Sequence, residues 1–254
     1  MTLVYDSTFA GFLTAVHHAR ESGAAAIERE NMEASLFSDS CFIRTDRQKA
    51  GALWLLIKKS FGKSVTGEII AAFLSDCSGI DTVLLECICR GLENRISPLD
   101  DYSSPSRISM MKAAWRTRRE LHMYQGILRF TELSDGSLYA IVQPDCDILP
   151  LMADHFSERY HAFRWVIRDR RRSKALFHET GRGALLAGNI DLGNNEDREK
   201  RANGNIFSAD ELSIREAWKS YFRHVTIRER TNPHLQRSFM RKKYRGLATE
   251  FEGI

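Results

Sequence analysis

Apolar side chains three and four residues apart dominate the first half of the chain, and this spacing is that of one face of an α-helix. Short apolar stretches at Leu3–Tyr5 and Ser40–Arg44 predict strands, whereas residues 23–33 are predicted as a loop. The helices predicted in this half are one near Phe9–Val16, three between residues 46 and 92, and one from Ser106 to Tyr124.

After Gly126 the pattern changes from helical spacing to alternation. Ile127–Leu133 and Ser137–Val142 alternate apolar and polar positions around a Ser-Asp-Gly turn, which predicts a β-hairpin. A helix at Leu149–Tyr160 and a second strand pair, Arg164–Arg168 with Ala175–His178, are predicted to follow. The pattern indicates an α+β fold, with a helical N-terminal half packed on a small, mostly antiparallel sheet.

The last third of the chain differs from the rest in composition. Residues 181–207 are rich in glycine and asparagine and hold few large apolar side chains, which predicts a flexible linker. Ser208 and Glu211 have the spacing of a capping box and predict the start of a helix. We therefore expect a core domain over residues 1–180, a linker over residues 181–207 and a helical, basic tail over residues 208–254.

Composition narrows the class of protein. The 254 residues are 43% hydrophobic and 28% charged, which is ordinary for a globular protein with a core of its own. No apolar run approaches the roughly 20 residues of a membrane span, and the N-terminus has no secretory signal, so we expect a cytoplasmic protein without membrane association. The five cysteines fit no zinc or redox motif, and we expect reduced thiols.

Positive charge is concentrated near the C-terminus. The net charge is only +4, but residues 215–245 hold ten basic residues against two acidic ones, interleaved with aromatic side chains. Cations neutralise phosphates and aromatic faces stack on unpaired bases, so this mixture favours a nucleic-acid-binding segment. The alternative is an amphipathic tail whose aromatic side chains dock on the core. The candidate contacts in the tail are Trp218, Arg223, Arg237, Lys242, Lys243 and Tyr244.

A second basic cluster lies on the helix before the predicted hairpin. Arg116, Arg119 and His122 fall on one helical face, and Arg129 follows on the first strand. We interpret this cluster as one wall of a groove that binds phosphates, and Arg159 on the next helix is a separate candidate contact. A solvated helix face without a ligand is the alternative.

Three further residues indicate possible acid–base chemistry. Asp145 and Asp169 each follow a predicted strand, and His155 lies on the helix between them. Carboxylates and histidine at strand ends are typical of catalytic sites, although helix caps and ion pairs also place such residues there. The sequence contains no metal-protease, phosphate-loop, nucleophile-elbow or EF-hand motif, and we expect no bound metal or other cofactor.

Several short motifs along the chain occur together, in the same order, in one known family. They are Tyr5–Val16, Ser35–Phe37, Ala72–Ser75, His122–Phe130, Leu138–Ala140, Pro144-Asp145, Leu149-Pro150, His155–Tyr160 and Trp165–Asp169. On these motifs the chain resembles DNA-metabolism (DNA-repair) proteins, which share a domain of otherwise unknown function. The resemblance spans nearly the whole chain.

The resemblance implies a role in DNA repair or modification. Members of the family are found beside a radical S-adenosylmethionine (SAM) protein, and others are fused to a uracil-DNA-glycosylase-like domain. The present sequence lacks the C-x3-C-x2-C motif of radical SAM enzymes. Our leading hypothesis is therefore a DNA-binding accessory component that works with a separate radical SAM protein. The alternatives are an enzyme that acts on nucleic acid through Asp145, His155 and Asp169, and a protein-interaction adaptor.

Overall fold

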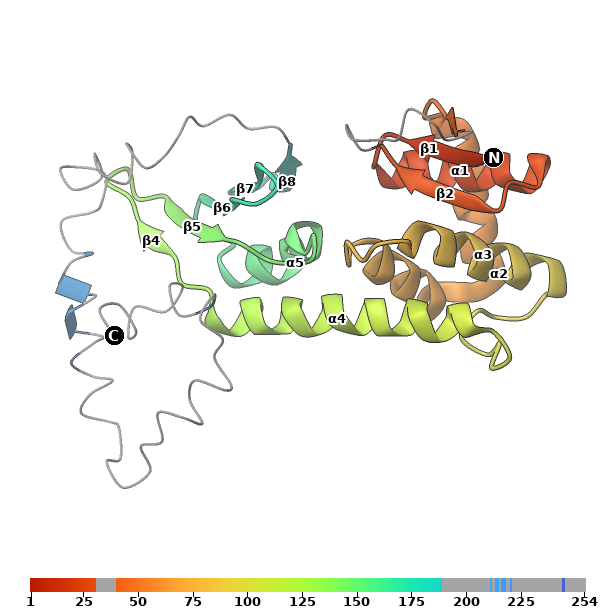
Figure 1. Ribbon diagram of the computed structural model, residues 1–254. Helices are drawn as coiled ribbons and strands as arrows, with labels where there is room; N and C mark the ends of the chain where they lie inside the picture. Colours follow the sequence, from red (N-terminus) through yellow and green to blue (C-terminus); the bar gives the residue numbers. More distant parts are fainter. Residues whose placement is uncertain are drawn as a thin grey trace, which may run out of the picture. The chain divides into compact units, whose positions relative to one another are not determined.

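A computed structural model of the chain contains two compact units (Figure 1). Unit 1 comprises Met1–Arg119 and Asp145–Asp147, and unit 2 comprises Glu120–Pro144 and Ile148–Ile254. The chain mixes helix and sheet, which confirms the α+β class, and the two units subdivide the stretch predicted as one core domain. The structure describes residues 1–30 and 40–188 and, beyond them, Glu211, Ser213, Ile214, Glu216, Ala217, Ser220 and Tyr244.

Unit 1 is built around a small parallel sheet. Strand β1 (Thr2–Tyr5) lies between β2 (Ala26–Arg29) and β3 (Ser40–Phe42), and α1 (Phe9–Ser22) connects β1 to β2. The amide of Gly11 donates to the Thr8 hydroxyl at 2.9 Å, which caps α1. The prediction of a loop over residues 23–33 is wrong at β2, because a four-residue strand with one buried residue is too short to show alternation.

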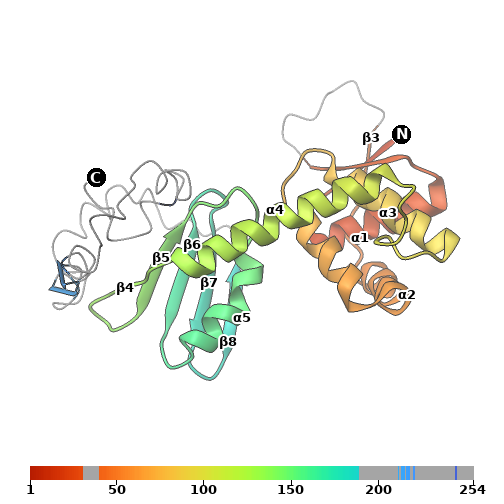
Figure 2. The same ribbon diagram turned by 90° about the horizontal axis from the view of Figure 1, so that it is seen from below.

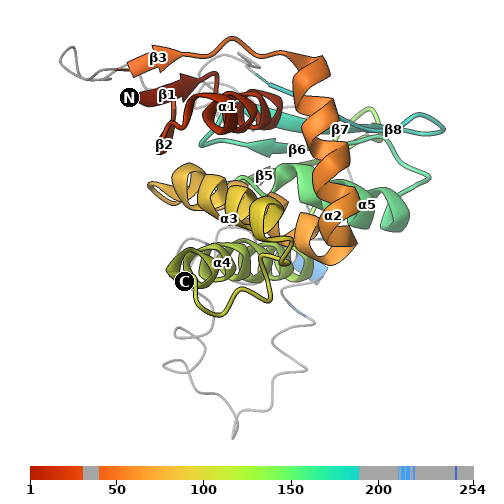
Figure 3. The same cartoon turned by 90° about the vertical axis from the view of Figure 1, so that its right-hand side faces the viewer.

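Three helices complete unit 1. They are α2 (Arg47–Phe73), α3 (Ile80–Asn94) and the first turns of α4 (Pro105–Ile127), whose last turns belong to unit 2. In Figures 1 and 3, α3 lies between the β1 and β2 strands and the first turns of α4. Asp46 caps α2 by accepting from the amides of Gln48 and Lys49 at 2.9 and 3.1 Å.

Helix α2 is broken in its middle. At Gly62 the backbone has φ +75° and ψ −176°, outside the helical region. The two halves of α2 and helix α3 therefore correspond to the three helices predicted between residues 46 and 92. Side chains with little or no exposure from both halves and from α3 meet in the core, among them Ile57, Ile69 and Leu84.

An arginine network ties the sheet of unit 1 to its helices. The guanidinium of Arg29 on β2 donates to Asp81 at 3.1 Å, to Asp76 at 2.7 Å and to the Phe73 carbonyl at 2.6 Å. Burial alone would lower the pKa of Arg29, but the charge of Asp81 raises it above its usual value. The end of α2 and the start of α3 are thus fixed against the same strand.

Unit 2 contains a five-stranded sheet in which the strands follow one another in chain order. The β5–β6 pair is parallel and the other pairs are antiparallel, so the sheet is mostly antiparallel as predicted. Helix α5 (Leu149–Arg159) connects β5 to β6 and packs against β7 and β8 (Figure 2). The strands are β4 (Thr131–Glu132), β5 (Leu138–Val142), β6 (Trp165–Asp169), β7 (Lys174–Glu179) and β8 (Gly183–Ala187).

Strand β8 occupies residues that the sequence predicts as the start of the linker. Ala184–Ala187 is an apolar run that pairs with β7, so these backbone groups are satisfied by the sheet despite the glycines on either side. Residues 189–207 of the predicted linker lie outside the described residues. The packing of a helical half on this sheet stays a prediction.

Gly62 gives a direct test of the break in α2. We expect Gly62→Ala to lower the free energy of unfolding by about 1–3 kcal/mol, because this backbone region is almost restricted to glycine. Gly51 is the matched control, since it lies in the first half of α2 with open space around an added methyl group. Gly51→Ala should raise the free energy of unfolding by about 0.5–1 kcal/mol, and urea titration of both variants measures the two changes. Equal effects of the two substitutions would contradict a strained turn at Gly62.

Candidate nucleic-acid interface

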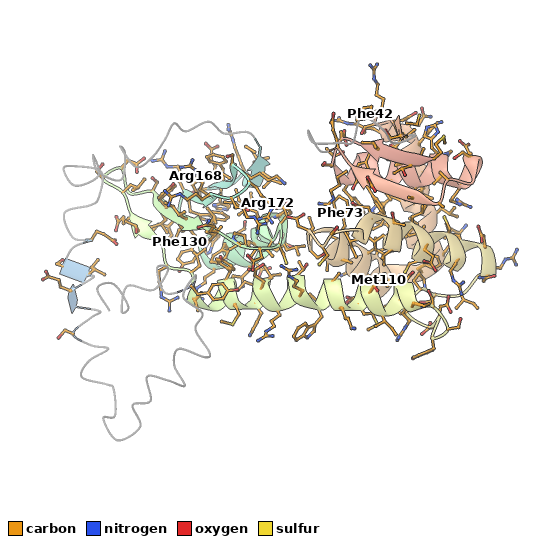
Figure 4. The ribbon with its side chains drawn as sticks, in the orientation of Figure 1. Phe42, Phe73, Met110, Phe130, Arg168 and Arg172 are labelled. Atoms are coloured by element: carbon orange, nitrogen blue, oxygen red, sulfur yellow. The ribbon has the colours of Figure 1, made fainter. Side chains whose placement is uncertain are left out.

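The outward face of α4 in unit 1 carries cations around an exposed indole. Met110, Ala114 and Thr117 are fully buried, whereas Trp115 is 62% exposed. In Figure 4, Met110 points toward the rest of unit 1, and a row of side chains extends from the opposite side of the helix. We name this surface the α4 cationic face, and it consists of Lys112, Trp115, Arg116 and Arg119, all of them exposed.

Trp115 and Arg119 form one unit of this face. The guanidinium carbon of Arg119 lies 5.1 Å from the centroid of the Trp115 ring, one helical turn away. A cation beside an exposed aromatic ring places a phosphate contact next to a stacking surface. Sequence reasoning selected Arg119 but missed Trp115, although the spacing of four residues was visible in the sequence.

Arg116 faces a different set of neighbours. Its Nη1 lies 3.5 Å from the Cys77 sulfur, within hydrogen-bonding distance. Burial would lower the pKa of Arg116, but nearby Cys146, Cys77 and Asp145 raise it. The structure therefore brings together two residues that the sequence assigns to different tasks, the proposed phosphate contact Arg116 and the proposed catalytic Asp145.

The cations predicted in unit 2 are more scattered. Arg129 donates through Nη1 to the carbonyls of Gly126 and Leu128, both at 3.1 Å, so its guanidinium is held at the end of α4. His122 is exposed on the last turns of α4. Arg159 is exposed at the end of α5, with its guanidinium carbon 5.7 Å from the Tyr160 ring centroid. These three side chains share no hydrogen bond or ion pair in the described part of unit 2.

Asp169 has a structural explanation. It is fully buried, and its Oδ1 accepts from the amides of Arg171 and Arg172 at 2.8 and 3.2 Å. Its Oδ2 lies 2.9 Å from Nη1 of Arg172, which also donates to the Pro144 carbonyl at 3.1 Å. Asp169 thus caps the turn between β6 and β7 and pairs with a cation on that turn, which leaves it no open side for a substrate.

The other two candidate catalytic residues lie in different units. Asp145 belongs to unit 1 and His155 to unit 2. The Nε2 of His155 is buried and has no hydrogen-bond partner among the described residues, and its ring packs edge-on against Phe156 with centroids 4.9 Å apart. Within either unit, the structure does not assemble the predicted group of Asp145, His155 and Asp169.

Tyr244 is placed in the interior of unit 2. It is 6% exposed, its ring meets Tyr124 edge-on at 5.3 Å, and its hydroxyl donates to Glu120 at 3.3 Å. A ring buried in this way has no face open to a base, which corrects its assignment as a stacking platform. The remaining tail candidates, Trp218, Arg223, Arg237, Lys242 and Lys243, lie outside the described residues.

The model of one protein family, a domain of unknown function termed DUF4130, matches residues 78–250. The chain belongs to the DUF4130 family. The matched region begins just before α3 and contains the whole α4 cationic face. No curated protein matches the chain, and no solved structure matches it.

No described helix is long and apolar enough to cross a membrane. No group of three histidine, cysteine or carboxylate side chains in the described ranges lies close enough together to hold a metal ion.

A substitution at Asp169 separates the structural role from catalysis. We expect Asp169→Asn to lower the free energy of unfolding by about 3 kcal/mol, because the Arg172 guanidinium loses the carboxylate charge beside it in a buried site. Asp135→Asn is the control, since that carboxylate also caps a turn, accepting from the Ser137 amide at 3.0 Å, but is exposed to solvent. Asp135→Asn should change the midpoint of urea unfolding little. An unchanged midpoint for Asp169→Asn would contradict the structural role.

Proposed function

We propose that this DUF4130 protein binds unpaired DNA through the α4 cationic face and acts as an accessory component in DNA repair or DNA metabolism, working with a separate radical SAM protein. The observation that carries the binding proposal is the exposed Trp115 ring with the Arg119 guanidinium beside it and Lys112 and Arg116 on the same face. Phosphates and bases are the ligand groups that such a surface suits.

The exposed indole argues for a ligand rather than for packing. A tryptophan on the outside of a helix leaves a large apolar area in water, and Ile108 and Met111, two turns and one turn earlier, are also 50% and 39% exposed. Stacking on a base would bury that area, and each such contact contributes about 1–3 kcal/mol. The cations beside it would add an attraction that depends on salt.

The accessory role rests on the resemblance to DNA-metabolism proteins and on one property of the sequence. The five cysteines do not form the C-x3-C-x2-C motif that would ligate the cluster of a radical SAM enzyme. In this proposal the partner supplies the radical chemistry, and the DUF4130 protein holds the strand on which it acts.

One observation favours catalysis by Asp145 as a second candidate. Its carboxylate acts electrostatically on Arg116, so an acid lies beside a proposed DNA contact. If Asp145 carries out chemistry, Asp145→Asn will abolish turnover of a nucleic acid and leave its binding intact. If the variant binds and supports turnover like the unaltered protein, catalysis by Asp145 is excluded.

Binding is tested by fluorescence anisotropy with a labelled single-stranded oligothymidylate over a series of salt concentrations. We expect the affinity to fall with salt, and Arg119→Gln to lower the slope of log K against log salt by about 0.7. Trp115→Ala should weaken binding about tenfold or more without changing that slope.

The controls are one exposed arginine and one exposed aromatic residue away from α4. Arg44→Gln and Phe163→Ala should leave both the affinity and the slope close to those of the unaltered protein. The proposal fails if binding is indifferent to salt, or if Trp115→Ala binds as tightly as Phe163→Ala.

A further inference from the structure

A pocket that is widely open to solvent lies beside the break in α2; it has a volume of about 900 Å³, and we call it the cavity. Its walls come from both halves of α2 and from one residue of α4, all within unit 1. The volume is within the range of small-molecule sites in proteins. The lining residues are Trp54, Lys58, Lys63, Ser64, Thr66, Gly67, Glu68, Ile70 and Arg118.

The charge of this cavity favours an anion. Its lining contains three cations and one carboxylate, and that carboxylate, Glu68, is paired with Arg118 at 2.8 Å. Among the described residues, neither Lys58 nor Lys63 has a carboxylate within ion-pair distance. Lys58 and Lys63, which lie on either side of Gly62 in the chain, therefore face the cavity, and no carboxylate of the described residues compensates their charge.

An oriented aromatic ring lies beside these charges. Trp54 packs edge-on against Phe9, with ring centroids 5.1 Å apart and planes at 90°. Its ring also lies 5.3 Å from the Lys58 ammonium. The Phe9 contact fixes the indole, so the part that lines the cavity forms a preorganised flat surface at low cost in conformational entropy.

Two glycines make the cavity possible. Gly62 breaks the helix, so residues of both its halves line one cavity. Gly67 allows Arg118 to approach α2, since a Cβ at that position would lie 3.3 Å from Nη2 of Arg118. The guanidinium then reaches Glu68 and neutralises the only acid in the lining.

We propose that this cavity takes one unpaired nucleotide, with its base against Trp54 and its phosphate between Lys58 and Lys63. The inference rests on the proposed function, because the nucleotide is part of the strand that the α4 cationic face holds. Arg118, which lines the cavity, and Arg119, which belongs to the α4 cationic face, are successive residues of α4 within unit 1. The face would then bind the backbone, and the cavity would select a base that is not paired.

The cavity is tested on the full chain with thymidine 5′-monophosphate, thymidine and inorganic phosphate as separate probes in calorimetric titrations. We expect the nucleotide to bind at least tenfold more tightly than either fragment. Lys63→Gln should weaken nucleotide binding at least fivefold and leave thymidine unaffected, whereas Trp54→Leu should weaken both nucleotide and thymidine. Lys59→Gln is the matched control, because Lys59 is an exposed lysine beside Lys58 that does not line the cavity.

The outcomes separate this inference from the proposed function. If Lys63→Gln and Lys59→Gln bind the nucleotide equally well, the assignment of the nucleotide to the cavity is overturned. The proposed function still stands in that case, provided that Trp115→Ala weakens binding of the oligothymidylate. If the nucleotide binds as expected but the oligothymidylate does not bind at all, the proposed function fails, and the claim that the nucleotide belongs to a bound strand fails with it.

Discussion

At Gly62 the chain takes a backbone conformation that other residues adopt only at a cost of about 1–3 kcal/mol, and it does so in the middle of a helix. Trp54 and Lys58 precede this break in the chain and Lys63 follows it, and the turn brings all three side chains to the lining of one cavity. In an unbroken helix these side chains would be spread along one straight helix axis. The proposed nucleotide site therefore depends on one glycine, and the pairing of Arg118 with Glu68 then decides which cations are left to meet an anion.

Much of the local structure follows from the sequence, because short-range patterns determine it. The alternation around Ser134–Gly136 predicts the β4–β5 hairpin, and the strand pair predicted at Arg164–Arg168 and Ala175–His178 corresponds to β6 and β7. The sequence pattern does not reveal the parallel sheet of unit 1, because β2 has only four residues and is stabilised by pairing with β1, whose partner residues lie 24 positions earlier in the chain. Strand β8 was missed because its glycine-rich surroundings resemble a linker, whereas pairing with β7 decides its structure.

The candidate site was only partly predictable for the same reason. A charge count finds Arg116 and Arg119, because cations are visible one residue at a time. The exposure of Trp115 and the cavity beside Trp54 depend on which side of each helix is covered, and tertiary packing decides that. Asp169 illustrates the opposite error: a carboxylate after a strand suggested chemistry, but the neighbouring amides and Arg172 use it as a cap.

The central claim is that unpaired DNA lies on unit 1, over the α4 cationic face and into the cavity at the break of α2. Photocrosslinking of single-stranded DNA that carries 4-thiothymidine, followed by peptide mapping, tests it most directly. We expect crosslinked peptides that contain Trp115 and Trp54, and we expect these crosslinks to be lost in Trp115→Ala and Trp54→Leu respectively. Crosslinks that map only outside residues 47–119 would contradict it.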